Sequence, residues 1–278
     1  MKTIVINSSN YIQNSGNKYV YNFPQTVRFE VGSGIGVSNI SLYNSIQNIT
    51  EKRQNNKVTL NWLGTNYVFI LDDGYYSVSD INYFIQSQCI KNGLYVTANS
   101  GLDNIYFVEL AINSIRYSTS LNLYAIPTES SAISQGYVKP SNATWSYPST
   151  AETPTLKFSQ PFGNIIGLTF GTYPSSASSS NIQFLSTQTP VLSPVDSLIL
   201  CCNLISSNYS IPSNVFFTVP LSSSLGTLIT VPISSVIFND IQPQHFSTLE
   251  ITIFDQLFNP VILLDKELTL TLVIQEKK

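Results

Sequence analysis

The segment Leu268–Ile274, with the sequence LTLTLVI, carries the clearest structural signal in the chain. Large apolar side chains alternate there with threonine, and a similar alternation occurs in Leu249–Phe254, LEITIF, before a turn at Asn259 and Pro260. A period of two sends successive side chains to opposite faces of an extended chain, so both segments are predicted to be half-buried β-strands. Threonine on the outer rows suits a pleated, partly wet surface. We expect both strands to lie inside sheets at the centre of a β-sandwich.

Short strand-like segments recur through the rest of the chain, roughly eight to twelve in all, at the spacing typical of all-β sandwiches. Lys57–Trp62 and Tyr67–Leu71 flank a short turn that contains Gly64, and they are predicted to form a tight hairpin. Glycines alternate with small residues from Gly32 to Gly36, which predicts a flexible turn or bulge. Pro127–Pro154 is rich in proline, serine and threonine without periodicity, so it is predicted to be a long surface loop.

One helix is predicted, because apolar residues recur at helical spacing between Ser77 and Gly93. Ser77 or Ser79 would act as its N-cap, and Gly93 would close its C-terminal end. The apolar residues of its narrow stripe are Ile81, Phe84, Ile85 and Cys89. A narrow stripe is typical of a helix that packs on the outside or the end of a sheet.

The composition is unusual in its low charge. Charged residues make up 10% of the 278 residues, against a typical ~25%. The formal net charge is −3 and no basic run occurs except at the C-terminus, so direct nucleic-acid binding through phosphates is not expected. No stretch has the length of a membrane span, and the N-terminus does not resemble a signal peptide. A surface this poor in charge would be prone to association, and it indicates either a neutral polar exterior or one covered by neighbouring subunits.

The three cysteines, Cys89, Cys201 and Cys202, fit no metal-site spacing. Cys201 and Cys202 lie in an apolar strand, where adjacent side chains point to opposite faces. Buried free thiols are therefore predicted, and these suit synthesis in a reducing, intracellular compartment.

No catalytic, cofactor-binding or metal-ligating residue is predicted. His245 is the one histidine, and no serine lies in a nucleophile-elbow motif, so a turn or interface role is expected for it. Asp72-Asp73-Gly74 is interpreted as a turn, because it lacks the other ligands of a calcium loop. A glycosidase would need two carboxyls in a cleft. The carboxylates considered for such a pair are Asp72, Asp73, Asp255, Asp265 and Glu267.

Two aromatic residues, Trp145 and Tyr147, lie in the long proline-rich segment. Exposed rings in a loop can form a stacking platform for sugars or an anchor between subunits. Low surface charge favours the anchor, but the sequence leaves both interpretations open. Trp145, Tyr147 and His245 are thus the candidate interface or loop anchors.

Several groups of residues, taken in order over most of the chain, have a combined pattern that resembles a known family. They are Leu42-Tyr43-Asn44-Ser45 with Asn48-Ile49-Thr50, Asp73–Asn82 (DGYYSVSDIN), Gly171-Thr172-Tyr173-Pro174, Pro190-Val191 with Ser193-Pro194-Val195, Phe254-Asp255-Gln256 with Pro260-Val261, and the ending from Asp265 to Ile274. The pattern is similar to the penton, or minor capsid, proteins of Mavirus-type virophages and of Polinton (Maverick) elements.

The resemblance implies a single jelly-roll sandwich of two four-stranded antiparallel sheets, ordered B-I-D-G and C-H-E-F. Leu249–Phe254 would be strand H and Leu268–Ile274 strand I. It also implies a homopentamer at the fivefold vertices of an icosahedral virion capsid, synthesised in the host cytoplasm. The partner would be a double jelly-roll major capsid protein, which is about twice as long as this chain.

From the strand pattern and the resemblance together we expect residues 1–112 and 191–278 to form the jelly roll. Residues 113–190 would be an insertion made of a β-hairpin and long loops. Two other function classes remain as alternatives. One is a carbohydrate- or receptor-binding β-sandwich, and the other is a hydrolase that uses His245 or a carboxylate pair.

Overall fold

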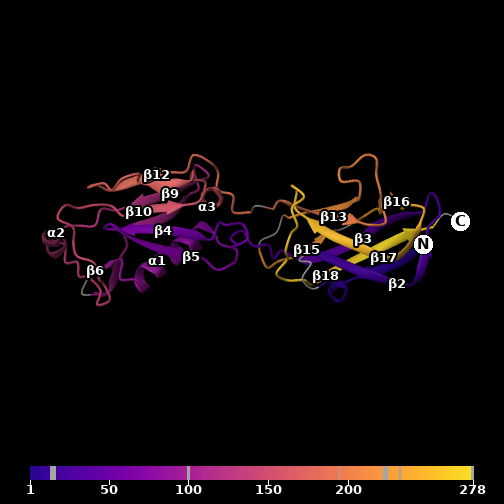
Figure 1. Ribbon diagram of the computed structural model, residues 1–278, viewed down its shortest axis with the longest axis horizontal. Coiled ribbons are helices and arrows are strands. Elements are labelled where there is room, and N and C mark those ends of the chain that lie inside the picture. Colours follow the sequence, from indigo (N-terminus) through magenta and orange to yellow (C-terminus); the bar gives the residue numbers. More distant parts are fainter. Residues whose placement is uncertain (13–16, 99–100, 194, 222–224, 232, 277–278) are drawn as a thin grey trace. The chain divides into compact units, whose positions relative to one another are not determined.

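Two groups of strands, each with its own hydrophobic core, make up the computed structural model, which describes residues 1–12, 17–98, 101–193, 195–221, 225–231 and 233–276. Unit 1 comprises Met1–Gln47 and Val195–Lys278, and unit 2 comprises Asn48–Pro194. Figure 1 follows the chain through both units. The described residues are rich in antiparallel sheet and contain few helices, so the expected all-β class is confirmed.

This division differs from the boundaries expected at 112/113 and 190/191. Residues 48–112 belong with unit 2, because the hairpin strands β4 (Lys57–Trp62) and β5 (Thr65–Ile70) join a sheet with β10 (Thr155–Phe158). Alternation along a strand identifies its buried face but not the sheet that it joins. The strand pattern and the resemblance together therefore placed these strands in a different group from the one that their pairing shows.

Unit 1 consists of two antiparallel sheets. Their strands are β1 (Lys2–Ile6), β18 (Leu268–Gln275), β3 (Gly34–Tyr43), β15 (Leu228–Val231) and β16 (Asn239–Asp240) in one sheet, and β14 (Val215–Pro220), β13 (Ser197–Cys202), β17 (His245–Phe254) and β2 (Lys18–Arg28) in the other. The first sheet has the order β1-β18-β3-β15, with β16 also pairing with β3, and the second has the order β14-β13-β17-β2. A short 3-10 helix, η1 (Ser8–Asn10), lies between β1 and β2.

The two C-terminal strands occupy interior positions in these sheets. β17 pairs with β2 and β13, and β18 pairs with β1 and β3. The alternating apolar residues of both strands are almost fully buried and belong to a single hydrophobic cluster, so the two sheets face each other across one core. These residues are Leu249, Ile251, Ile253, Leu268, Leu270, Leu272 and Ile274. The pairing and burial predicted for both strands are confirmed.

The glycines near residue 34 are only partly in a turn. Gly32 has φ +88° and lies in a turn, whereas Gly34 and Gly36 are part of β3. A Cβ atom on Gly36 would lie 2.4 Å from Val236 Cγ1 and 2.6 Å from the Ile237 carbonyl oxygen. Gly36 is therefore needed for a close approach of two chain segments rather than for flexibility.

Unit 2 is also built from antiparallel sheets around a core. In addition to β4, β5 and β10, its elements are α1 (Val78–Lys91), β6 (Val96–Ala98), β7 (Asp103–Ile105), β8 (Val108–Asn113), β9 (Ser118–Leu123), α2 (Glu129–Ser134), α3 (Gln160–Ile166), β11 (Gly171–Tyr173) and β12 (Ile182–Leu185). The sheets have the orders β11-β10-β4-β5, β12-β9-β8 and β6-β7. Residues of the two larger sheets and of α1 share one buried cluster.

The predicted helix is present as α1, but it is not the only one. Ser77 is its N-cap and forms a capping box with Asp80, and Gly93 follows its last turn with φ +67°. The described residues contain two further α-helices, α2 and α3, so the expectation of a single helix is wrong. α2 lies inside the segment predicted to be a loop. Both helices are under eight residues long and have little hydrophobic periodicity, which is why pattern analysis missed them.

None of the helices within the described residues is long and apolar enough to cross a membrane.

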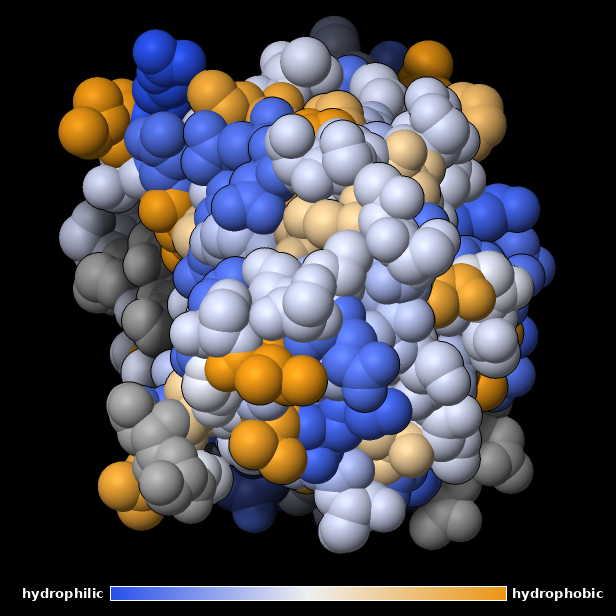
Figure 2. Space-filling view, turned by 90° about the vertical axis from the view of Figure 1, so that its left-hand side faces the viewer, coloured by the Kyte–Doolittle hydropathy of each residue, from blue (hydrophilic) through white to orange (hydrophobic). Residues whose placement is uncertain are grey.

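The end of unit 2 presented in Figure 2 is mainly pale or blue, and its hydrophobic residues form small separate groups. The described residues form three salt bridges: Lys2–Glu276, Lys18–Glu250 and Arg28–Glu30. All three are in unit 1.

Candidate functional site

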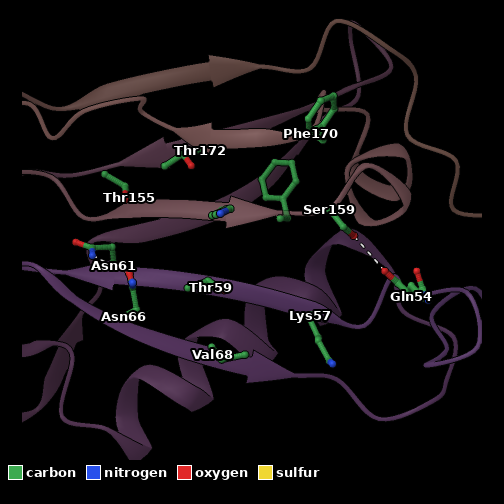
Figure 3. A pocket seen from close by; sticks show the side chains of 12 residues that line it. Gln54, Lys57, Thr59, Asn61, Asn66, Val68, Thr155, Ser159, Phe170 and Thr172 are labelled. Carbon is green, nitrogen blue, oxygen red and sulfur yellow. Dashed lines mark hydrogen bonds between the residues drawn. The ribbon is translucent and has the colours of Figure 1, made fainter.

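The outer face of the sheet β11-β10-β4-β5 in unit 2 forms an open groove of about 800 Å³ (Figure 3). The alternation along β4 explains its chemistry. Val58, Leu60 and Trp62 are buried in the core, so Lys57, Thr59 and Asn61 face the groove. The full lining is Gln54, Lys57, Thr59, Asn61, Asn66, Val68, Thr155, Lys157, Phe158, Ser159, Phe170 and Thr172.

The strand register arranges the lining side chains as rows across the sheet. In the central row Thr172 is paired with Lys157, Lys157 with Thr59, and Thr59 with Val68. In the next row Thr155 is paired with Asn61, and Asn61 with Asn66. Lys57 lies two positions before Thr59 on β4, which makes it the diagonal neighbour of Lys157. Residues in this relationship are about 7–8 Å apart, and their Cβ atoms are somewhat closer.

The groove has positive charge and no negative charge among its lining residues. Neither Lys57 nor Lys157 forms an ion pair or hydrogen bond through its side chain within the described ranges. The hydroxyls of Thr59, Thr155 and Thr172 likewise have no hydrogen-bond partner in that part of the chain. Asn61 Nδ2 donates to Asn66 Oδ1 at 2.8 Å, which leaves the Asn66 amide nitrogen free to donate into the groove.

The edge of the groove is formed by the loop after β10. Ser159 Oγ donates to the Gln54 carbonyl oxygen at 3.1 Å, the dashed line in Figure 3, and Ser159 is also the N-cap of α3. Phe170 lies just before β11, and 67% of it is exposed. Sequence reasoning missed this groove. Its signal is the concentration of Thr, Asn and Lys at alternate positions of three strands, but their adjacency depends on long-range pairing.

Trp145 is an internal anchor of unit 2 rather than an exposed platform. The residue is buried, and its indole Nε1 donates a hydrogen bond to the Gly93 carbonyl oxygen at 2.6 Å. Its ring makes edge-to-face contacts with Trp62 at 5.3 Å and with Tyr147 at 5.2 Å between centroids. A ring enclosed in this way cannot offer a face for a sugar to stack on.

Tyr147 is half-buried, and Lys139 Nζ lies over both aromatic rings of this pair, 5.4 Å from the Trp145 centroid and 5.2 Å from that of Tyr147. Burial, and secondarily the charge of Glu129, raise the pKa of Tyr147. Lys139 Nζ also donates to the Trp145 carbonyl oxygen at 3.1 Å. These contacts fold the segment back onto unit 2, so it is not a loose surface loop.

His245 is exposed and is the first residue of β17, where it is paired with Arg28 of β2. Its imidazole has no hydrogen-bond or ion-pair partner within the described residues. A catalytic triad needs a nucleophile and a carboxylate bonded to the imidazole. Neither group is bonded to the imidazole in the described structure. His245 lies in a strand, and the prediction that it lies in a turn is wrong.

Three of the five carboxylates considered for catalysis support loops instead. Asp255 is buried, and its Oδ1 accepts from the backbone N–H groups of Leu257 and Asn259 at 2.8 Å each. Asp73 Oδ1 accepts from Glu51 N at 2.7 Å, and Asp265 Oδ1 from Glu267 N at 2.8 Å. Within the described residues no three His, Cys, Asp or Glu side chains are grouped so that they could hold a metal ion.

The three cysteines are free and buried, as predicted. Desolvation raises the pKa of the Cys89 thiol to about 12 and that of Cys202 to about 12, and it also raises the pKa of Cys201. Cys202 belongs to the core cluster of unit 1. Thiols with raised pKa values are protonated at neutral pH and are poor nucleophiles, so these residues are structural.

Unit 1 exposes apolar side chains on several of its connections, and two of these connections carry more than one. Tyr209 and Ile211 are almost completely exposed between β13 and β14. Leu257, Ile262 and Leu264 are exposed between β17 and β18. Sequence reasoning did not single them out, although apolar residues within Ser-, Asn- and Pro-rich connections were visible as a signal. Apolar side chains scattered singly are ordinary on a protein surface, whereas a contiguous patch of them marks a surface that contacts another molecule.

Comparison with known proteins gives a likeness to solved structures but not to a described family. No protein-family model and no curated protein matches the chain. Among solved structures, the chain is similar to the crystal structure of selenomethionine-labelled mavirus penton protein, with 12% identity over 100% of both chains and a TM-score of 0.43.

Proposed function

We propose that this chain is a structural capsid protein that forms pentameric vertex capsomers, and that unit 1 is a single jelly roll. The strand order of unit 1 is the observation that carries the proposal. If the eight main strands are lettered B to I along the chain, with β16 left out, one sheet is B-I-D-G and the other is C-H-E-F. These are the orders that the resemblance to virophage and Polinton pentons implies.

The connectivity also supports the lettering. In this scheme β17 is strand H, between C and E, and β18 is strand I, between B and D. Unit 2 then becomes an insertion between strands D and E, because the chain leaves unit 1 after β3 and returns before β13. The insertion is larger than the residues 113–190 expected from the sequence.

The surface chemistry fits a subunit that is covered by neighbours. Charged residues are scarce, and the exposed apolar residues Tyr209, Ile211 and Leu264 lie on connections of unit 1. A fivefold ring is a closed heterologous assembly in which one flank of each subunit meets the opposite flank of the next. Specific interfaces of this kind bury on the order of 1,000 Å² or more, which favours weakly charged flanks.

The proposed role is non-enzymatic. What supports this part is that His245 has no bonded nucleophile or carboxylate and that Asp73, Asp255 and Asp265 bond to loop backbone. The proposed partners are further copies of the chain and a double jelly-roll major capsid protein, and the proposed location is the virion.

The proposal is tested by the mass and shape of the purified chain. Native mass spectrometry at micromolar concentration is expected to give five times the 30.8 kDa of one chain, and negative-stain images are expected to show fivefold rings. Because charge contributes little to the proposed interface, the ring should persist when the salt concentration is raised.

A chain that remains monomeric, both alone and when mixed with the shell protein of the same particle, would contradict the capsid role. A closed ring with another number of subunits would contradict the pentamer. The matched control is the chain lacking β18, residues 1–267, which loses strand I and should form no ring.

A further inference from the structure

We propose that the groove on the outer face of β11-β10-β4-β5 binds an anionic glycan, that is, a polyhydroxylated chain carrying carboxylate or sulfate groups. This inference does not rest on the proposed capsid role, because it concerns the surface chemistry of unit 2 alone. Pentamer formation and glycan binding can therefore fail separately.

The positive charge of the groove is the first feature that favours an anionic ligand. Lys57 and Lys157 are diagonal neighbours on adjacent strands, and neither forms an ion pair within the described ranges. Like charges directly opposite each other destabilise a sheet, and this diagonal pair repels more weakly across its longer separation. No carboxylate lines the groove, although acidic residues outnumber basic ones in the chain as a whole. An anion placed between the two ammonium groups would relieve the repulsion through charge-assisted hydrogen bonds.

The polar side chains that surround the two lysines are the second feature, and they favour a sugar. Around the two lysines stand hydroxyls that have no partner among the described residues, those of Thr59, Thr155 and Thr172. The Asn66 amide nitrogen adds a free donor, because the Asn61 amide occupies the Asn66 oxygen. A hydroxyl both donates and accepts, so a surface of this kind matches the hydroxyls of a sugar, which do the same.

The shape of the groove is the third feature. The groove is open rather than enclosed, and the exposed ring of Phe170 stands at its edge, where it could pack against the apolar face of a sugar ring (Figure 3). An acidic peptide strand is the less favoured occupant. An extended peptide gains its backbone hydrogen bonds at the edge of a sheet, whereas this groove lies on the face, where the backbone is already paired.

The experiment measures binding to the full chain by isothermal titration calorimetry. The probes are a heparin-derived hexasaccharide, which carries sulfate, sialyllactose, which carries carboxylate, maltohexaose, which is neutral, and a hexaglutamate peptide. At least one of the two anionic oligosaccharides is expected to bind, and maltohexaose is expected to bind much more weakly. Binding of the heparin hexasaccharide would show that the groove recognises sulfate, and binding of sialyllactose would show that it recognises carboxylate. Binding should weaken as salt is raised, because two ion pairs contribute.

Two sets of variants separate charge from sugar recognition. The double variant Lys57→Ala/Lys157→Ala is expected to weaken binding about tenfold or more. Its matched control, Lys91→Ala/Arg116→Ala, removes the same charge from exposed positions elsewhere in unit 2 and should bind like the parent chain. Thr59→Val/Thr155→Val keeps both lysines and the side-chain shape, and is expected to weaken glycan binding severalfold through the lost hydroxyls.

Three results would overturn the proposal. The first is that neither anionic oligosaccharide binds at millimolar concentration. The second is that the Lys91/Arg116 control loses as much affinity as the groove variant, which would assign binding to net charge. The third is that hexaglutamate binds as tightly as the glycans and the threonine variant changes nothing, which would make the groove a peptide or general anion site. Far-UV circular dichroism confirms that each variant is folded.

Discussion

The indole Nε1 of Trp145 donates a 2.6 Å hydrogen bond to the carbonyl oxygen of Gly93, 52 positions earlier in the chain. Gly93 follows the last turn of α1, and a Cβ atom there would lie 2.7 Å from the Asn142 carbonyl oxygen. The segment around Trp145 thus packs against the C-terminal end of α1 and bonds to it. Both tryptophans of the chain, Trp62 and Trp145, are in unit 2, so their fluorescence reports on unit 2 alone.

Trp145→Phe is expected to lower the free energy of unfolding of unit 2 by roughly 1–3 kcal/mol, since it leaves the Gly93 carbonyl oxygen without its buried donor. Urea unfolding followed by the remaining Trp62 fluorescence measures the change. Tyr83→Phe, at an exposed position of α1, is the control and should have the stability of the parent chain. Equal stability of both variants would show that the bond contributes nothing.

Ser77→Ala is expected to destabilise unit 2 by about 1 kcal/mol near neutral pH, because it removes the N-cap of α1. Ser77 donates to Asp80 Oδ2 through its Oγ at 2.6 Å and its backbone N–H at 2.9 Å. These bonds, and the side-chain bond first, lower the pKa of Asp80 below its ordinary value of 3.8. Ionised Asp80 therefore stabilises the fold above pH 3.8, and this contribution is lost as pH falls through the lowered pKa.

The lowered pKa of Asp80 also predicts how the destabilising effect of Ser77→Ala depends on pH. The difference in stability between the parent chain and Ser77→Ala should be largest near neutral pH and should narrow as Asp80 becomes protonated. Tryptophan fluorescence during urea unfolding at a series of pH values measures it. A difference that stays constant, or widens, in acid would mean that the Ser77–Asp80 contact is not formed as described.

Gly36→Ala is expected to destabilise unit 1 by about 1–3 kcal/mol, because the added Cβ would overlap Val236 and the Ile237 carbonyl oxygen. Differential scanning calorimetry of the full chain should show a shift in the transition of unit 1 only. Asn39→Ala, at an exposed position of the same strand, is the control. A Gly36→Ala protein as stable as this control would indicate that the neighbouring segment moves away at little cost.

Truncation after Glu267 removes β18 and should abolish folding of unit 1, because β1 and β3 then lose their pairing partner inside the sheet. Unit 2 has its own core and should keep its tryptophan unfolding transition. The control ends at Gln275, the last residue of β18. A soluble 1–267 chain that retains native circular dichroism and the calorimetric transition of unit 1 would refute this central role of β18.

The features predicted correctly from the sequence are those that depend on residues close together in the chain. The burial of β17 and β18 follows from alternation, α1 from its capping serine, periodicity and closing glycine, and the β4–β5 hairpin from its glycine turn. In that hairpin Leu63 and Gly64 both have positive φ, as a two-residue turn requires, so β5 begins at Thr65, two residues earlier than predicted.

The features missed depend on contacts between distant residues. Trp145 lies in a segment without periodicity, and its burial depends on Trp62 and Gly93, which are far away in sequence. The groove arises only when β4, β5, β10 and β11 are placed side by side. The boundaries of unit 2 were missed because strands on either side of residue 48 have similar composition, and only their pairing separates them.

The two hydrophobic clusters have no residue in common, since one draws only on residues 4–46 and 195–274 and the other only on residues 49–168. A substitution that disturbs one cluster is therefore expected to leave the packing of the other intact. Evolution could thus recast or exchange the inserted unit while the surrounding strands keep the sequence that their own packing demands. In such a chain, substitutions can accumulate on the surface of unit 2 without destabilising unit 1.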